Sequence, residues 1–116
     1  MVYDKKLADR IKKILQKCKG VAEKEMFGGK SFLINGKMCC GVIKNDLVIR
    51  VNPKDYEKLL NRQNVRPMDF TGKPIKGFIY VNSKGCKSSV ALSNWVKLGV
   101  DYVTSLREEN KKTITT

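Results

Sequence analysis

A turn signal near the middle of the chain limits the possible fold more than any other feature. Asn35-Gly36 separates two apolar runs, at residues 31–34 and 37–43. Both residues of an Asn-Gly pair tolerate the positive φ of a type I′ turn, so the pair predicts a tight β-hairpin. A second polar turn at residues 44–46 leads into another apolar run at 47–51. Three consecutive strands joined by tight turns predict an antiparallel β-meander.

Three amphipathic segments predict helices around this meander. Each begins at a residue that caps helices well or favours the first helical position, and each carries apolar residues at helical spacing. The expected bounds are Asp4 to about Lys19 with Gly20 as the stop, a short middle helix from Asn52-Pro53, and a last helix from Ser88 or Ser89 to Leu106.

The remaining apolar runs predict further strands. Residues 21–26 and 77–81 have strand-like patterns, and residues 65–70 contain Pro67. Because proline cannot donate to a β-ladder, a strand at 65–70 is expected at an edge of the sheet. These elements predict an α+β fold with an antiparallel sheet of about five or six strands. A chain of 116 residues fits one domain, here residues 1–106, with a flexible C-terminal tail at 107–116.

The chain contains no histidine and four cysteines. The absence of histidine removes His-based acid–base catalysis, and no Cys-x-x-Cys pair suggests a zinc site, so neither metal nor cofactor is expected. The adjacent Cys39 and Cys40 are expected on opposite faces of a strand, as reduced, packed thiols. With no membrane-spanning run and no signal-peptide core, the expected location is the cytoplasm.

Charge is the strongest compositional feature. Lys and Arg number 24 against 11 Asp and Glu, a net charge of +13. Such a charge attracts polyanions such as nucleic acid. Nineteen of the 24 cations are lysines, however, and lysine is also the ordinary solvating residue. The charge therefore indicates either a polyanion site or a lysine-rich bias for solubility.

One basic stripe is predicted along the first helix. Lys6, Arg10, Lys13 and Lys17 follow one another at i, i+4, i+7 and i+11, which gives a row about 16 Å long. The stripe is either a solvated helix face or a surface that follows the phosphates of a nucleic acid.

Two other groups of residues are weak candidates for chemistry. Phe27-Gly28-Gly29 before Lys30 is the nearest approach to a phosphate loop, but a strand follows it where a helix should begin. Asp69 is a lone acid in a turn-rich segment, where it either accepts turn N–H groups or acts as an acid. No nucleophile–base pair and no pair of acids emerges, so the protein is not expected to be an enzyme.

Three segments, taken in order, carry a family resemblance. They are Tyr3 to Ile11, Lys24 to Val42, which includes the Phe27-Gly28-Gly29 corner and the Asn35-Gly36 turn, and Arg66 to Phe78. With Trp95 in the last helix, they resemble the TfoX N-terminal domain across roughly residues 3–106.

The resemblance implies an α+β fold and a link to TfoX/Sxy, the bacterial regulator of competence genes that acts with the cAMP receptor protein at promoters. It implies no catalytic residue. The full-length regulator carries a second, helical C-terminal domain, whereas this chain is expected to end in a short tail. The expected function is a non-enzymatic regulatory domain whose basic surface contacts a transcription factor of the cAMP receptor protein type or nucleic acid. The alternative is a protein-interaction module that uses the exposed sheet edge near Val65 to Phe70.

Overall fold

The computed structural model describes the backbone of residues 3–26, 28–68 and 77–115, and the side chains of the same ranges except residues 26 and 107–115. Helices and strands alternate in the order of an α+β domain. Their bounds are α1 (Lys5–Leu15), β1 (Val21–Met26), β2 (Gly29–Ile34), β3 (Lys37–Ile43), β4 (Asp46–Arg50), α2 (Tyr56–Leu60), β5 (Val65–Pro67), β6 (Phe78–Val81) and α3 (Ser89–Thr115).

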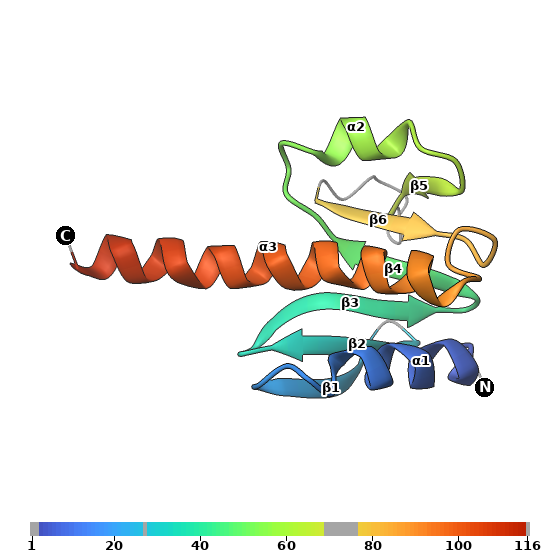
Figure 1. The fold of residues 1–116 in the computed structure, drawn as a ribbon, viewed down its shortest axis with the longest axis horizontal. Coiled ribbons are helices and arrows are strands. Elements are labelled where there is room, and N and C mark those ends of the chain that lie inside the picture. Colours follow the sequence, from blue (N-terminus) through green and yellow to red (C-terminus); the bar gives the residue numbers. More distant parts are fainter. Residues whose placement is uncertain (1–2, 27, 69–76, 116) are drawn as a thin grey trace.

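The described strands form one six-stranded antiparallel sheet in the order β1-β2-β3-β4-β6-β5 (Figure 1). The first four strands are the predicted meander. At their turn, Asn35 and Gly36 have φ values of 53° and 83°, as a type I′ turn requires. The strand that contains Pro67 lies at the edge, beyond β6, as its missing N–H predicts.

The first helix is shorter than predicted. Asp4 caps α1, but the helix ends at Leu15 rather than near Lys19. The amide of Cys18 donates to the carbonyl of Leu15, three residues back, at 2.9 Å. This tighter hydrogen bonding ends the α-helix, so Lys17 lies in the turn that follows it.

The middle helix also begins later than predicted. Asn52 accepts hydrogen bonds from the amides of Lys54, through its side chain, and of Asp55, through its carbonyl. The chain from Pro53 to Asp55 is therefore held in a turn, and α2 begins at Tyr56.

The last helix begins as predicted and continues further than predicted. The Ser88 hydroxyl accepts a hydrogen bond from the amide of Ala91 at 3.0 Å, which caps α3. The helical backbone then runs to Thr115, past the predicted end at Leu106, and its last turns extend beyond the sheet (Figure 1). The domain boundary at residue 106 stays a prediction.

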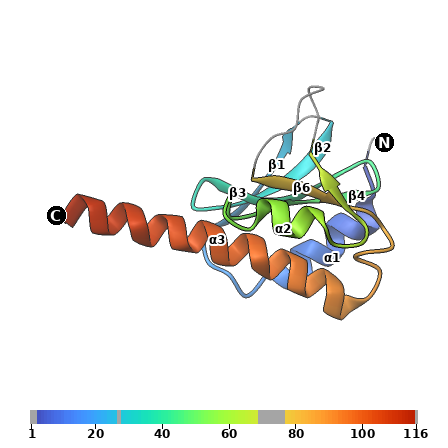
Figure 2. The ribbon, with the colours of Figure 1, turned by 90° about the horizontal axis from the view of Figure 1, so that it is seen from above.

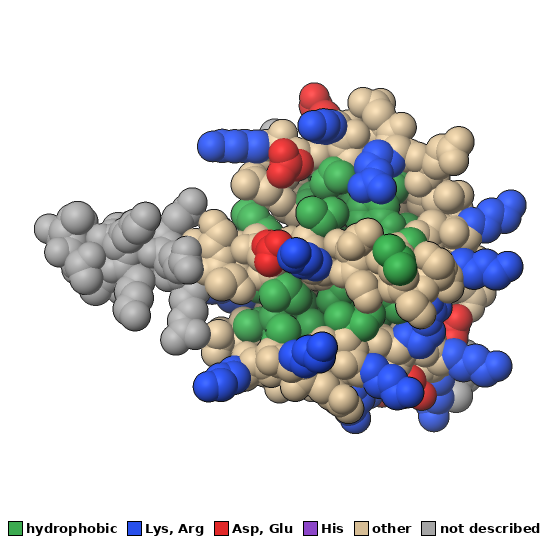
Figure 3. Space-filling model, in the orientation of Figure 1, with side chains coloured by type: hydrophobic (Ala, Val, Ile, Leu, Met, Phe, Trp, Pro, Cys, Tyr) green, Lys and Arg blue, Asp and Glu red, His purple; other side chains and the backbone are tan. Residues whose placement is uncertain are grey.

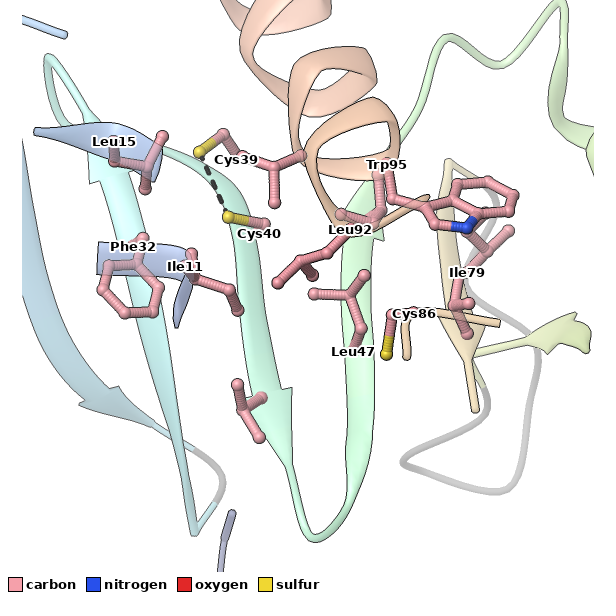
Figure 4. Close-up of a cluster of buried hydrophobic side chains, with 14 of the residues drawn as sticks. Ile11, Leu15, Phe32, Cys39, Cys40, Leu47, Ile79, Cys86, Leu92 and Trp95 are labelled. Atoms are coloured by element: carbon pink, nitrogen blue, oxygen red, sulfur yellow. Dashed lines mark hydrogen bonds between the residues drawn. The ribbon is translucent and has the colours of Figure 1, made fainter. Parts of the chain in front are cut away.

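The helices lie on one face of the sheet (Figure 2). The main core lies between that face and α1, α2 and α3, and it includes Ile11, Phe32, Leu47 and Trp95 (Figure 4). A smaller cluster forms around Val48, Met68 and Tyr80. Val48 alternates with Leu47 and Ile49 along β4, which places this smaller cluster on the opposite face.

The prediction that Cys39 and Cys40 point to opposite faces is wrong. Phe32 pairs with Cys40, while the next residue of β2 pairs with Met38, so Cys39 is the extra residue of a β-bulge. The bulge breaks the alternation of side chains along β3. Both thiols are fully buried in the main core, with their Sγ atoms 3.6 Å apart (Figure 4).

Candidate interaction surfaces

The predicted basic stripe is divided between α1 and the turn after it. Lys6, Lys13 and Lys17 are exposed, and within the described ranges none of them forms a salt bridge. Arg10 is only half exposed, and its Nη2 donates a hydrogen bond to the carbonyl oxygen of Lys87 at 2.9 Å. Arg10 therefore joins α1 to the loop before α3 in addition to carrying charge.

The surroundings of the stripe contain charges of both signs. The bond from Arg10 holds the loop of Lys87, an exposed cation, beside α1. Local sequence patterns could not reveal this neighbour, because the two residues are 77 positions apart. Asp9 is exposed three positions after Lys6 and four before Lys13, where it reduces the positive potential.

Two lysines near the stripe, Lys12 and Lys30, already form salt bridges with one carboxylate. Glu23 on β1 lies 3.4 Å from the Nζ of Lys12 and 2.7 Å from that of Lys30. The hydrogen bond with Lys30 lowers the pKa of Glu23 and raises the pKa of Lys30. These two lysines are therefore less available to a ligand than the cations of the stripe.

Positive charge is spread over the face that carries α2 and α3. Figure 3 shows Lys and Arg side chains around the rim of this face. These cations create a general attraction for polyanions.

The glycine corner is explained by backbone geometry. Gly28 is exposed with a φ of 73°, a conformation that favours glycine. A Cβ at Gly29 would overlap the carbonyl oxygen of Val42 on the paired strand, so close strand approach requires glycine there. Phe27 and Asp69 lie outside the described residues.

Two arginines, Arg50 and Arg66, make contacts that link neighbouring elements. Arg66 forms a salt bridge with Asp46 and lies 4.5 Å from the ring centroid of Tyr80. Arg50 lies between the rings of Phe78 and Tyr102, at 5.7 and 5.6 Å. Both arginines thus contribute to packing between neighbouring elements.

The buried thiols are poor candidates for chemistry. The hydrogen bond between them lowers the pKa of Cys39, whereas the same bond and burial raise the pKa of Cys40. Both are shielded from solvent. Across the described ranges, no group of three or more Cys, Asp or Glu side chains is arranged to hold a metal ion. Over the same residues, no helix is long and apolar enough to cross a membrane.

A groove between α3 and the loop residues 62–64 and 84–85 was not predicted from the sequence. It encloses about 920 Å³. Figure 3 shows hydrophobic side chains on both sides of α3, including the side towards α2. Val90 and Leu98, which are 72% and 39% exposed, both line this groove. The sequence does contain these two apolar residues, but both lie outside the apolar stripe of the last helix and therefore did not predict a groove.

These observations define a class of protein. It is a small α+β domain with an antiparallel meander, helices on one face of the sheet and a strongly basic exterior. The family model of the TfoX N-terminal domain matches residues 13–102, so the chain belongs to this family. The segment Tyr3 to Ile11, on which part of the resemblance depends, lies outside the matched range. Searches of the curated proteins and of the solved structures gave no match.

Proposed function

We propose that this chain is a non-enzymatic regulatory domain of the cytoplasm that contacts a transcription factor of the cAMP receptor protein type or nucleic acid. The contact would use the α1 basic surface, which comprises Lys6, Arg10, Lys13 and Lys17. Membership of the TfoX N-terminal domain family carries the proposal, because the family resemblance connects the fold to gene regulation at promoters.

The geometry of α1 supports the choice of surface. Exposed lysines without salt-bridge partners among the described residues keep their charge available for phosphates or carboxylates. The Arg10 bond to the loop before α3 adds the cation of Lys87 to the same region. The net charge of +13 would increase the rate of encounter with any polyanion.

A paired charge reversal tests the surface. The double variant Lys13→Glu/Lys17→Glu should bind a DNA duplex more weakly than the parent. Its log–log salt slope between about 50 and 200 mM should become shallower by about 1.8, since each lost phosphate contact removes about 0.9. Fluorescence anisotropy with a labelled duplex measures both quantities.

The matched control is Lys54→Glu/Lys58→Glu, which lowers the net charge equally through two exposed lysines near α2. This control should keep most of the parental affinity and slope. If both double variants lose the same affinity, binding depends on net charge alone and the α1 basic surface is not the contact. Circular dichroism of each variant confirms that it is folded.

The alternative function uses a sheet edge. β5 is an outermost strand of the described sheet, and it covers residues 65–67 of the predicted edge. A partner strand could pair with the main chain of this edge, although Pro67 offers no N–H. Such pairing would change little with salt, whereas phosphate contacts weaken steeply. The salt titration above therefore separates the two functions.

A further inference from the structure

We propose that the groove along α3 binds an acidic, amphipathic helix of a protein partner. This α3 groove is lined mainly by Arg62, Lys84, Val90, Trp95, Lys97 and Leu98. The inference adds a second contact surface to the proposed function, and it rests on that function in taking the partner to be a protein.

The first observation is exposed apolar surface inside a groove. Val90 and Leu98 are the large hydrophobic side chains that the described part of the chain leaves exposed, and both line the same cavity of about 920 Å³. They lie eight residues apart on α3, with Ala91 between them. Apolar side chains in a groove are the usual contact for the apolar face of a helix.

The second observation is charge. Arg62, Lys84 and Lys97 line the groove and are exposed. One acid, Asp101, lies at its far end. A ligand that carries carboxylates beside its apolar residues would complement this arrangement, and the net charge of +13 favours the same partner.

The groove is also held in place before any ligand arrives. The guanidinium of Arg62 lies 4.4 Å from the ring centroid of Trp95. The indole N–H of Trp95 donates to the carbonyl oxygen of Gly85 at 3.2 Å. These contacts fix the two walls relative to each other, which reduces the ordering cost of binding.

A second, smaller cavity shows where an acidic ligand should end. It encloses about 220 Å³, shares Leu98 and Asp101 with the groove, and adds Asp55. Two carboxylates there would repel an acidic segment. The distance along α3 from Val90 to Asp101 is about 16 Å, which corresponds to about three turns of a bound helix.

The same features argue against nucleic acid as the occupant. Exposed valine and leucine side chains contribute nothing to phosphate binding. The Trp95 ring, which could stack on a base, lies under the Arg62 guanidinium. The α3 groove is therefore assigned to a protein helix.

The test uses two labelled peptides of about 14 residues with identical composition. One places leucines on one helical face and glutamates on the other, and its scrambled counterpart lacks that pattern. In an NMR titration of the ¹⁵N-labelled protein, the patterned peptide should shift the amides of Val90, Ala91 and Leu98. The scrambled peptide should bind at least about tenfold more weakly.

Two exposed positions in the groove provide the variants. Leu98→Glu and Lys97→Glu should each weaken binding of the patterned peptide, Leu98→Glu by about tenfold or more. The matched controls are Ser89→Glu and Lys24→Glu, which make similar changes at exposed residues outside the groove lining. These controls should stay within about twofold of the parent.

Several results would overturn the proposal. The proposal is wrong if the patterned peptide shows no saturable binding, or if both peptides bind equally. It is also wrong if the amide shifts are confined to α1, or if Leu98→Glu binds the patterned peptide as tightly as the parent does. DNA binding distinguishes failure of the groove proposal from failure of the proposed function. Leu98→Glu should leave duplex affinity unchanged, whereas Lys13→Glu/Lys17→Glu should reduce it. If a DNA duplex shifts the groove amides instead, the occupant is nucleic acid and the protein-helix proposal is wrong.

Discussion

At the scale of single residues, Gly99 sets how closely the longest helix approaches the sheet. A Cβ at this position would overlap the carbonyl oxygen of Cys39 at the bulge of β3. A glycine within a helix usually weakens it by about 1 kcal/mol relative to alanine. Here the close contact between α3 and β3 requires it.

Gly99→Ala should therefore destabilise the protein, against the direction of helix propensity. We expect the free energy of unfolding to fall by about 1–3 kcal/mol, because α3 must move away from a backbone atom. Urea unfolding measures the change. The control Ser105→Ala, at an exposed position of α3, should gain a few tenths of a kcal/mol at most. A more stable Gly99→Ala variant would show that α3 can shift without cost.

The cysteines differ in accessibility at the same scale. Cys18 is half-buried, whereas Cys39, Cys40 and Cys86 are buried. Burial raises the pKa of Cys86, as it does that of Cys40, so both stay protonated and poorly nucleophilic at neutral pH.

In the native protein, one thiol should react with a small alkylating reagent much faster than the others. We expect Cys18 to label first and the three buried thiols to label only on opening or unfolding. Mass spectrometry of digested samples over a time course measures each site. The Cys18→Ser variant should lose the fast phase. Early labelling of Cys39 or Cys40 would mean that the bulge is open to solvent.

At the scale of elements, α1 depends on its N-terminal cap. The Asp4 carboxylate accepts a hydrogen bond from the amide of Leu7 at 3.1 Å, and the Asp4 amide donates to the carbonyl of Lys44. The side chain satisfies an otherwise unpaired N–H, and the backbone bond ties the start of α1 to the turn between β3 and β4.

Asp4→Ala should lower the free energy of unfolding by about 1 kcal/mol, the usual cost of losing an N-cap. Asp4→Asn, which keeps an accepting oxygen, should recover most of it. Chemical denaturation followed by circular dichroism compares the two variants. Equal stability of Asp4→Ala and the parent would show that the backbone bond to Lys44 alone positions α1.

The third helix has two roles at this scale. One face carries Leu92, Trp95 and Val96 into the core, and another carries Val90 and Leu98 into the α3 groove. Val90 and Leu98 keep 72% and 39% of their surface exposed, so part of their apolar surface stays outside the core. We therefore infer a partner from the outer face of α3 rather than from its buried stripe.

At the scale of the whole molecule, charge and shape have separate roles. Cations lie around the rim of the face that carries α2 and α3 (Figure 3), and the net charge of +13 attracts acidic partners at long range. We propose that the α3 groove and the α1 basic surface then provide defined contacts. The two surfaces should respond to different variants, which allows each to be tested without the other.

Much of the fold could be predicted from the sequence because its signals are local. The Asn35-Gly36 turn, the caps at Asp4 and Ser88 and the edge position of Pro67 each depend on the backbone preferences of one or a few neighbouring residues. Helical spacing also predicts the cations of the α1 basic surface. Because α1 ends at Leu15, however, Lys17 lies in the turn that follows the helix.

The remaining features were decided by contacts between distant parts of the chain. The bulge that turns Cys39 into the core depends on the register of β2 against β3. The bond of Arg10 to the loop of Lys87 depends on α1 meeting α3, and the groove depends on α3 packing beside the loop residues 62–64 and 84–85. Local preferences determine where each element begins and turns, but which side chains meet is determined only when the elements pack together.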